Sequence, residues 1–355
     1  MRLSDETVLT YTAEADCKGV MPMSGGTYLS ARDHSMNNHL AVLMMGKLVP
    51  GTETVWNPEE LRYYLTYVLN GKSIDTLFGG LIFNPVSGKS HRFIHPMYAG
   101  YGESAEKQDW DWVIDELFRS GRNIDAAQQA ARTKTDIWVC LPYPGPGQRS
   151  FGRVNGKVLD FTVEDDRYAA VIDWADRFLA RWKEEEGKLT KLTFRGFVWQ
   201  REAILLPDRP LVTRVNAALK NRKVKTIWLP NYGSAGVIDW KERGFDLVGV
   251  NPNYYGNTDH DLNWMRNTAV FTKHYGMGLQ INYGKGYIFN DTHLLDYLNL
   301  GTAEQYGYQE NCFMVYQLHQ RTMKEAYEKH LLDYIRIYSF TKNIYQRVHY
   351  PGIAY

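Results

Sequence analysis

Short apolar runs alternate along this chain with longer stretches of helical periodicity. Each short run is almost continuously apolar, which is typical of strands buried on both faces in a parallel sheet. Eight such strands are predicted, at residues 40–49, 76–83, 135–141, 191–199, 224–229, 245–250, 278–283 and 312–317.

The segments between these strands carry helical patterns. Asn57 is the predicted N-cap of the first helix and Pro58 its first residue, since these residue types favour those positions. The connection after Gly233 is short, and its pattern does not define a helix. Helices are predicted at residues 57–69, 109–118, 123–132, 165–185, 209–221, 259–275, 292–306 and 321–340.

Eight strands that alternate with helices favour one closed (β/α)8 TIM-type barrel over an open doubly wound sheet. The 355 residues exceed the roughly 250 of a typical barrel, which leaves room for an N-terminal extension and long βα loops. We expect the extension at residues 1–39, packed on a barrel domain at 40–355. No GxGxxG follows the first strand and no GxxxxGK[ST] occurs, which weighs against a nucleotide phosphate site.

Charge and hydropathy narrow the choice of ligand. The net charge of +1 and the pI near 7.7 come from evenly mixed signs, so neither nucleic acid nor an anionic membrane surface is an expected partner. No apolar run approaches the ~18 residues of a membrane span, and residues 1–11 lack the apolar centre of a signal peptide. Localisation stays open: cytoplasmic, or secreted, periplasmic or cell-surface if a leader was removed.

Cysteine and histidine spacing gives no sign of a metal site. Cys17, Cys140 and Cys312 lie far apart without a CxxC pair, which favours free buried thiols over a disulfide framework or zinc. The ten histidines form no HExxH or comparable pair. We therefore expect neither a metal nor a cofactor.

Amide and aromatic residues recur where the predicted strands end. Asn and Gln both donate to and accept from hydroxyl groups, and Tyr and Trp offer flat faces on which sugar rings lie. Each of these residues alone is common where a strand passes into a loop. The recurrence of amides and aromatic rings at many strand ends favours a sugar-binding cleft. The candidate substrate-binding residues are Asn84, Tyr143, Trp199, Arg201, Asn231, Tyr232, Asn253, Tyr254, Asn282, Tyr283 and Gln317.

One carboxylate stands out in this pattern. Glu202 follows the apolar strand 191–199, at the barrel position where catalytic groups are found. With Trp199 beside it, we expect the pKa of Glu202 to be raised, as a general acid requires. Arg201 is either a ligand for a substrate carboxylate or a salt-bridge partner.

Other ionisable groups have simpler explanations. Asp109, Asp111 and Asp115 are spaced like acids in the first turns of a helix, as is the pair at 165–166. His260, between Asp259 and Asp261, is a candidate for the rim of the cleft. The polar segment 32–34 is expected to be a solvated loop rather than a cover of the cleft.

Several blocks of the sequence resemble the bacterial domain of unknown function family 4855. They are LFGGLIFNP from residue 77, KQDWDWVIDELF from 107, VCLPYPGPGQRSFG from 139, GFVWQRE from 196, IWLPNYGS from 227, GFDLVGVNPNYY from 244 and GMGLQINY from 276. The resemblance implies a (β/α)8 barrel similar to retaining glycoside hydrolases, with catalytic glutamates after strands 4 and 7. It names no substrate.

The strand-7 block departs from the family pattern. That block usually resembles G-x-E-I-E, whereas this chain has the uncharged amides Gln280 and Asn282. A retaining glycosidase needs a carboxylate nucleophile, because an amide does not readily form the glycosyl ester. Three interpretations stay open for Gln280: an inactivating Glu→Gln substitution, the authentic sequence of a subgroup that uses other groups, or the mark of a non-catalytic binder.

The predicted function is therefore glycoside hydrolysis in polysaccharide degradation, with Glu202 as acid/base and position 280 as the nucleophile site. An oligosaccharide or glycan is the expected partner. The first alternative is a non-catalytic carbohydrate-binding barrel. A barrel lyase or aldolase is a weaker one, because Lys285 is the only lysine near the end of strand 7 and it follows a glycine-rich turn.

Overall fold

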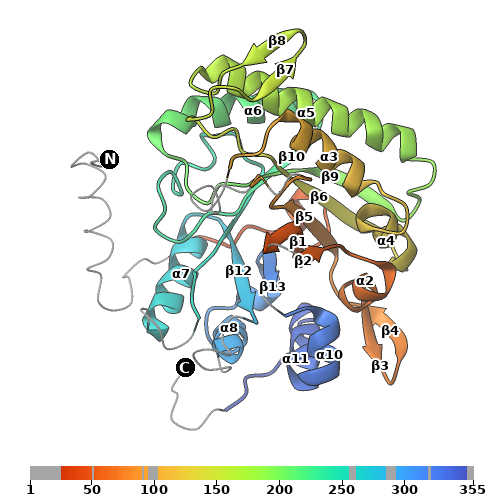
Figure 1. Ribbon diagram of the computed structural model, residues 1–355. Helices are drawn as coiled ribbons and strands as arrows, with labels where there is room; N and C mark the ends of the chain where they lie inside the picture. Colours follow the sequence, from red (N-terminus) through yellow and green to blue (C-terminus); the bar gives the residue numbers. More distant parts are fainter. Residues whose placement is uncertain are drawn as a thin grey trace.

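A computed structural model describes residues 25–49, 52–89, 92–94, 103–255, 261–284, 293–318 and 321–349. Its centre is a closed barrel of eight parallel strands, in the order β13-β12-β11-β10-β9-β6-β5-β1, closed by pairing of β13 with β1 (Figure 1). The predicted (β/α)8 barrel is confirmed. Its strands are β1 (Leu40–Val49), β5 (Gly80–Pro85), β6 (Thr135–Leu141), β9 (Leu192–Trp199), β10 (Lys225–Trp228), β11 (Leu247–Val250), β12 (Gly278–Tyr283) and β13 (Met314–Leu318).

Alternating side chains divide the core into two parts. Inward-facing residues such as Val42, Trp138 and Val315 fill the barrel interior. Outward-facing residues such as Phe197 and Tyr316 belong to a larger cluster between the sheet and the helices. This division follows from the period of two along each strand, and it makes the interior a packed core rather than a pore.

Gly196 is required where β9 bulges against β6 and packs closely on β10. The register between β6 and β9 shifts at this point, and Gly196 has φ +157°. A Cβ atom here would lie 1.9 Å from the carbonyl oxygen of Lys225. Only glycine allows this approach, so the GF block serves the barrel wall that carries Glu202.

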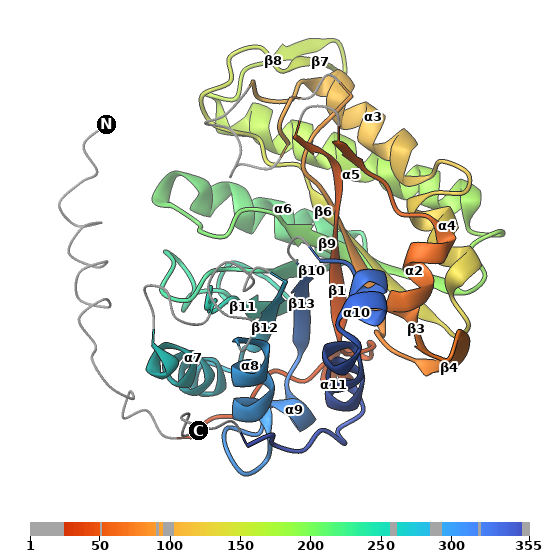
Figure 2. The same ribbon diagram turned by 60° about the horizontal axis from the view of Figure 1, so that its bottom comes forward.

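Helices cover the outside of the barrel. In Figures 1 and 2, α10 and α11 lie between α8 and α2 on the side of β1 and β13. The described α-helices are α2 (Pro58–Leu65), α3 (Lys107–Leu117), α4 (Asn123–Ala130), α5 (Glu164–Glu185), α6 (Arg209–Asn221), α7 (Leu262–His274), α8 (His293–Gly301), α9 (Tyr308–Asn311), α10 (Met323–Lys329) and α11 (Leu331–Thr341).

The helix predicted at 292–306 ends at Gly301 in α8, and two other predicted helices also differ from the observed ones. The first, predicted at 57–69, begins as expected with the Asn57 cap but ends at Leu65. The chain then forms a hairpin of β3 (Thr66–Leu69) and β4 (Lys72–Thr76). Asn70 and Gly71 turn that hairpin with positive φ, which the Asn-Gly pair favours strongly.

The second is the helix predicted at 321–340. It is broken into α10 and α11 at His330, whose ψ of 50° is not helical.

No helix lies between β10 and β11, where residues 229–246 form turns. The sequence pattern after Gly233 did not decide whether a helix is present there. Two further small elements leave the barrel: β2 (Thr52–Thr54), paired antiparallel with β1, and the hairpin of β7 (Gly152–Val154) and β8 (Lys157–Leu159).

The described part of the N-terminal segment closes the amino-terminal end of the barrel. Leu29 donates its N–H to the carbonyl of Met277 and accepts from the N–H of Phe313, just before β12 and β13. Ala31 and Met36 belong to the interior cluster. The short 3-10 helix Arg32–His34 therefore lies at the end of the barrel opposite the strand C-termini. The division at residue 39 stays a prediction, since residues 1–24 lie outside the described part.

Cys140 and Cys312 are free and buried, as expected, and Cys17 lies outside the described residues. Burial raises the pKa of both described thiols, which keeps them unreactive. Within the described ranges, no helix is long and apolar enough to cross a membrane. Nor does any cluster of three or more His, Cys, Asp or Glu side chains in those ranges have an arrangement that could hold a metal ion.

Candidate active site

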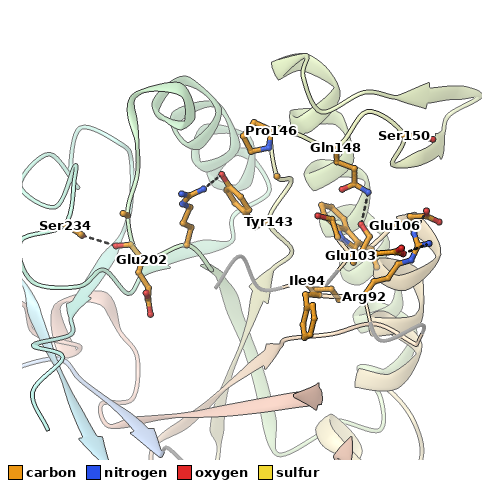
Figure 3. A pocket seen from close by; sticks show the side chains of 18 of the residues that line it. Arg92, Ile94, Glu103, Glu106, Tyr143, Pro146, Gln148, Ser150, Glu202 and Ser234 are labelled. Carbon is orange, nitrogen blue, oxygen red and sulfur yellow. Dashed lines mark hydrogen bonds and ion pairs between the residues drawn. The ribbon is translucent and has the colours of Figure 1, made fainter. Parts of the chain in front are cut away.

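A cavity of about 900 Å³ opens at the carboxyl ends of the barrel strands. The loops after β5, β6, β9 and β10 line it, so it lies over one side of the barrel mouth. Figure 3 shows Glu202 and Tyr143 on one side and Arg92, Glu103 and Glu106 on the other. Further lining residues include Ile94, Trp110, Gln148, Ser150, Arg201, Asn231, Tyr232 and Ser234.

Glu202 stands three residues beyond the end of β9, the fourth strand of the barrel, and the β10 loop holds it in place. Asn231 donates from Nδ2 to Oε2 of Glu202 at 3.1 Å. The carbonyl of Glu202 accepts from Oγ of Ser234 at 2.9 Å, as Figure 3 shows. Trp228 in β10 donates from Nε1 to the carbonyl of Arg201 at 2.8 Å. Two neighbouring strands thus fix one carboxylate at the mouth.

Arg201 belongs to a charged network behind the cavity wall. Its Nη1 donates to the hydroxyl of Tyr143 at 2.5 Å, and that hydroxyl donates to Oδ2 of Asp208 at 2.8 Å. Arg167 in α5 pairs with Oδ1 of Asp208 at 2.5 Å, and both side chains are almost fully buried. Burial, followed by the charge of Asp208, raises the pKa of Tyr143 to about 12, so the phenol stays protonated at neutral pH.

Tyr255 lies close to Glu202 and was not among the predicted site residues. Burial, followed by the charge of Glu202, raises the pKa of Tyr255 to about 12. Its hydroxyl donates to Oδ1 of Asn253 at 2.9 Å, and Asn253 is exposed with a left-handed φ of 56°. The β11 loop thereby brings a protonated phenol into the electrostatic reach of Glu202.

Gln280 lies below the cavity, inside the barrel. It is the third residue of β12, the seventh barrel strand, and its side chain has no exposed surface. Its Nε2 donates to the carbonyl of Gly249, and its Oε1 accepts from Nε2 of Gln317 at 3.0 Å. Gln280 therefore does not line the described cavity with Glu202, and both ends of its amide are engaged.

Gln280 is one of a group of buried amides near the strand ends. Asn282 is also fully buried and donates to Oδ1 of Asn251 at 2.8 Å. Gln200 donates to Oδ1 of Asn84 at 2.8 Å. Three acceptor oxygens of these strand-end amides are buried without a hydrogen-bond partner within the described structure: Gln200 Oε1, Asn282 Oδ1 and Asn231 Oδ1. Of these three residues, Asn231 alone belongs to the lining of the described cavity.

Four of the aromatic residues predicted to bind substrate differ in their positions. Tyr232 lines the cavity and packs edge-on against Trp264. Trp199 does not line it: the side chain is buried in the outer core and supports Tyr143 through an edge-on contact of 6.1 Å. Tyr254 and Tyr283 are also buried, with hydroxyls that donate to Asp296 and Asp333.

Of the acids assigned to helix starts, Asp109, Asp165 and Asp166 have that role, whereas Asp111 and Asp115 lie further along α3. Asp109 completes a capping box with Glu106 at the start of α3, and Asp261 caps α7. Asp111 pairs with Lys107 and Arg177. Asp115 is exposed on α3, and residues 165 and 166 lie in the first turn of α5. Residues 259, 260 and 285 lie outside the described part of the chain.

Sequence reasoning missed the cavity wall opposite Glu202. Arg92 pairs there with Glu103 at 3.1 Å and also with Glu106. Gln148 reaches the carbonyl of Ala105 at 3.0 Å and joins this wall to the β6 loop. The glycine- and proline-rich loop after β6 was one available signal, because such loops project from strand ends.

The fold and the cavity define a (β/α)8 barrel whose polar site lies at the strand C-termini. The model of the family described as "Domain of unknown function (DUF4855)" matches residues 44–343. The chain belongs to this family, which confirms the resemblance in the sequence. No curated protein matches the chain.

Solved structures with a similar fold come from different enzymes. A GH113 β-1,4-mannanase shares 13% identity at a TM-score of 0.41, over 80% of this chain and 88% of that one. A tri-modular GH5 endo-β-1,4-glucanase from Bacillus licheniformis shares 10% identity at a TM-score of 0.48, over 89% of this chain and 61% of that one. A mutant tryptophan synthase α-subunit from Pyrococcus furiosus shares 8% identity at a TM-score of 0.35, over 86% of this chain and 97% of that one. Similarity this low transfers neither substrate nor mechanism to this chain.

Proposed function

We propose that this protein is a glycoside hydrolase in which Glu202 acts as the general acid/base. The observation that carries the proposal is the position of Glu202: at the end of the fourth barrel strand, in the cavity, with Asn231 donating to its carboxylate. A carboxyl group so placed can protonate the departing glycosidic oxygen and later remove a proton from water. Asn231 and Tyr232, which line the cavity, supply polar and flat contacts for a sugar ring.

A retaining mechanism needs a second carboxylate, for which position 280 is the proposed site. Gln280 is nearly isosteric with glutamate, but its amide does not readily attack an anomeric carbon. A glutamate at this position would also lose the hydrogen bond to the carbonyl of Gly249. We therefore propose that this chain, with glutamine, binds its glycan and does not form a covalent intermediate through residue 280.

An inverting mechanism needs a carboxylate base that activates water instead of a nucleophile. Glu103 and Glu106 line the same cavity across from Glu202, and Arg92 pairs with both (Figure 3). The side chain of Glu103 is 78% exposed, so solvent reaches it readily. Glu103 is the proposed base of this alternative.

A non-catalytic carbohydrate-binding barrel is the second candidate function. The specific observation in its favour is that the interior end of β12 presents the amides Gln280 and Asn282, and no carboxylate. Such a protein would bind the glycan with the same amides and aromatic rings, without turnover.

Turnover of aryl glycosides separates these candidates. The parent chain, Glu202→Gln and Glu103→Gln are assayed with matched good and poor leaving groups, and glycan binding is measured in parallel. Loss of turnover on Glu202→Gln with binding retained supports the acid/base role. Glycan binding without turnover in the parent chain and in Gln280→Glu favours the binding barrel.

A further inference from the structure

The Arg201 side chain presents unused hydrogen-bond donors to the cavity. Nη1 is directed to Tyr143, whose ring also lies 5.0 Å from the guanidinium carbon. Nε and Nη2 have no protein acceptor within the described residues, and the side chain is 29% exposed. A guanidinium edge with two parallel N–H groups matches a carboxylate or a sulfate.

The buried charges behind Arg201 leave it with an excess of positive charge. Asp208 is the only acid among the described groups that pairs with Arg201, at 3.8 Å. Arg167 holds the same carboxylate at 2.5 Å and is itself buried, with Nε bonded to the carbonyl of Pro144 at 2.8 Å. Two arginines thus share one aspartate, and only Arg201 faces the cavity. The bridging phenol of Tyr143 is neutral and offsets neither charge.

The three carboxylates of the described cavity lining, Glu103, Glu106 and Glu202, form no ion pair with Arg201. On the opposite wall Glu103 and Glu106 both pair with Arg92, which leaves that cluster with one negative charge in excess. Glu202 is adjacent in sequence but forms no ion pair with Arg201 within 4.0 Å, and its Oε2 accepts from Asn231 instead. The cation at Arg201 is therefore available to a ligand close to the proposed acid.

We propose that Arg201 forms a subsite for an acidic substituent, so that the substrate is a glycan bearing carboxylate or sulfate groups. The proposal rests on the proposed function for the position of the scissile bond, but not for the binding itself. The network of Tyr143, Asp208 and Arg167 holds the guanidinium in place before the ligand arrives, which lowers the entropy lost on binding.

Calorimetric binding of matched glycans tests the subsite without any need for turnover. The ligands are a set of uronate oligosaccharides, their carboxyl-reduced counterparts, and sulfated oligosaccharides with their desulfated forms. We expect one acidic class to bind about 10- to 100-fold more tightly than its neutral counterpart, from charge-assisted hydrogen bonds. Arg201→Gln removes this preference, and Arg201→Lys retains part of it. The preferred class identifies the anion.

A matched control is Arg149→Gln, because Arg149 is exposed in the same loop as Gln148 but does not line the cavity. It should keep the acidic preference. The proposal is overturned if the acidic and neutral members of every pair bind equally, or if Arg201→Gln, shown to be folded by its thermal unfolding, weakens both equally. Acid-selective binding without hydrolysis contradicts only the hydrolase proposal, whereas hydrolysis without acid preference contradicts only the subsite.

Discussion

Asn231 and Glu202 join two consecutive loops of the barrel mouth, with Nδ2 of Asn231 3.1 Å from Oε2 of Glu202. The N–H of Asn231 also donates to the carbonyl of Glu202 at 3.3 Å. The loop after the fifth strand therefore orients the carboxylate that follows the fourth. We expect any catalysis by Glu202 to depend on this contact.

Asn231→Asp tests that dependence through pH. A second carboxylate beside Glu202 favours its protonated form, so the alkaline limb of the kcat/KM profile should move to higher pH, by about one unit. Asn231→Ala removes the same hydrogen bond without adding charge, so it should lower kcat/KM and move the limb upward by less than Asn231→Asp does. If the alkaline limb of the kcat/KM profile is unchanged in Asn231→Asp, Glu202 is not the group whose titration sets that limb.

Tyr143→Phe should destabilise the protein by about 1–3 kcal/mol, because Oδ2 of the buried Asp208 loses its hydroxyl donor. Equilibrium denaturation measures the free energy of unfolding. Tyr168→Phe is the control: its ring lies 4.5 Å from the guanidinium of Arg214, and no hydrogen bond joins its hydroxyl to another described residue. It should stay within about 0.5 kcal/mol of the parent. If both variants lower the free energy of unfolding equally, the hydrogen bond from Tyr143 to Asp208 does not contribute to stability as proposed.

Gly196→Ala should disrupt the wall between β9 and β10, because the new Cβ meets the carbonyl oxygen of Lys225 at 1.9 Å. We expect a loss of at least about 3 kcal/mol or a failure to fold. Gly187→Ala is the matched control, since a Cβ atom added there would have no neighbouring atom within 4 Å and its φ is not in the left-handed region. Thermal and denaturant unfolding of both variants measures the difference.

His39 should make stability depend on acid pH. Burial, followed by the charge of Lys342, lowers the pKa of His39 to about 3 from an ordinary value of 6.5. Between these two pH values His39 is protonated in the unfolded chain but neutral in the folded chain. The free energy of unfolding therefore falls as pH decreases from about 6.5 towards 3. His39→Asn suits the left-handed φ of 59° and should flatten this part of the profile, whereas exposed His274→Asn should not. Parallel profiles for His39→Asn and the parent would contradict this assignment.

The strands were predictable because they are buried on both faces. Residues 135–141 were predicted with the observed ends of β6, and the β12 prediction also matched. The hairpin β3–β4 was missed because a helical pattern was extended past Leu65 and over the Asn70-Gly71 turn. That dipeptide was a sufficient local signal, as the positive φ at both residues shows.

The site was predictable only in part. Glu202, Tyr143 and Asn231 could be found because each follows a strand end, and parallel strands bring their ends together. Nearness to a strand end does not by itself show which face of the barrel wall a side chain occupies. Trp199 and Tyr283 point outward into the core, while Gln280 and Asn282 alternate with the outward residues of β12 and are buried among amides. Arg92 and Glu103 lie in a long loop whose path depends on tertiary packing.

The central claim is that Glu202 catalyses glycoside hydrolysis in this barrel. The most direct measurement follows the product anomer by proton NMR in the parent chain and in Gln280→Glu, each with and without Glu202→Gln, over a panel of oligosaccharides and aryl glycosides. Asn84→Asp controls for a new carboxylate among the same amides. The account predicts retaining hydrolysis by Gln280→Glu, reduced about 10²- to 10⁴-fold by Glu202→Gln and most for poor leaving groups. A folded Gln280→Glu variant that binds the glycan but yields no Glu202-dependent product, together with an inert parent chain, would contradict it.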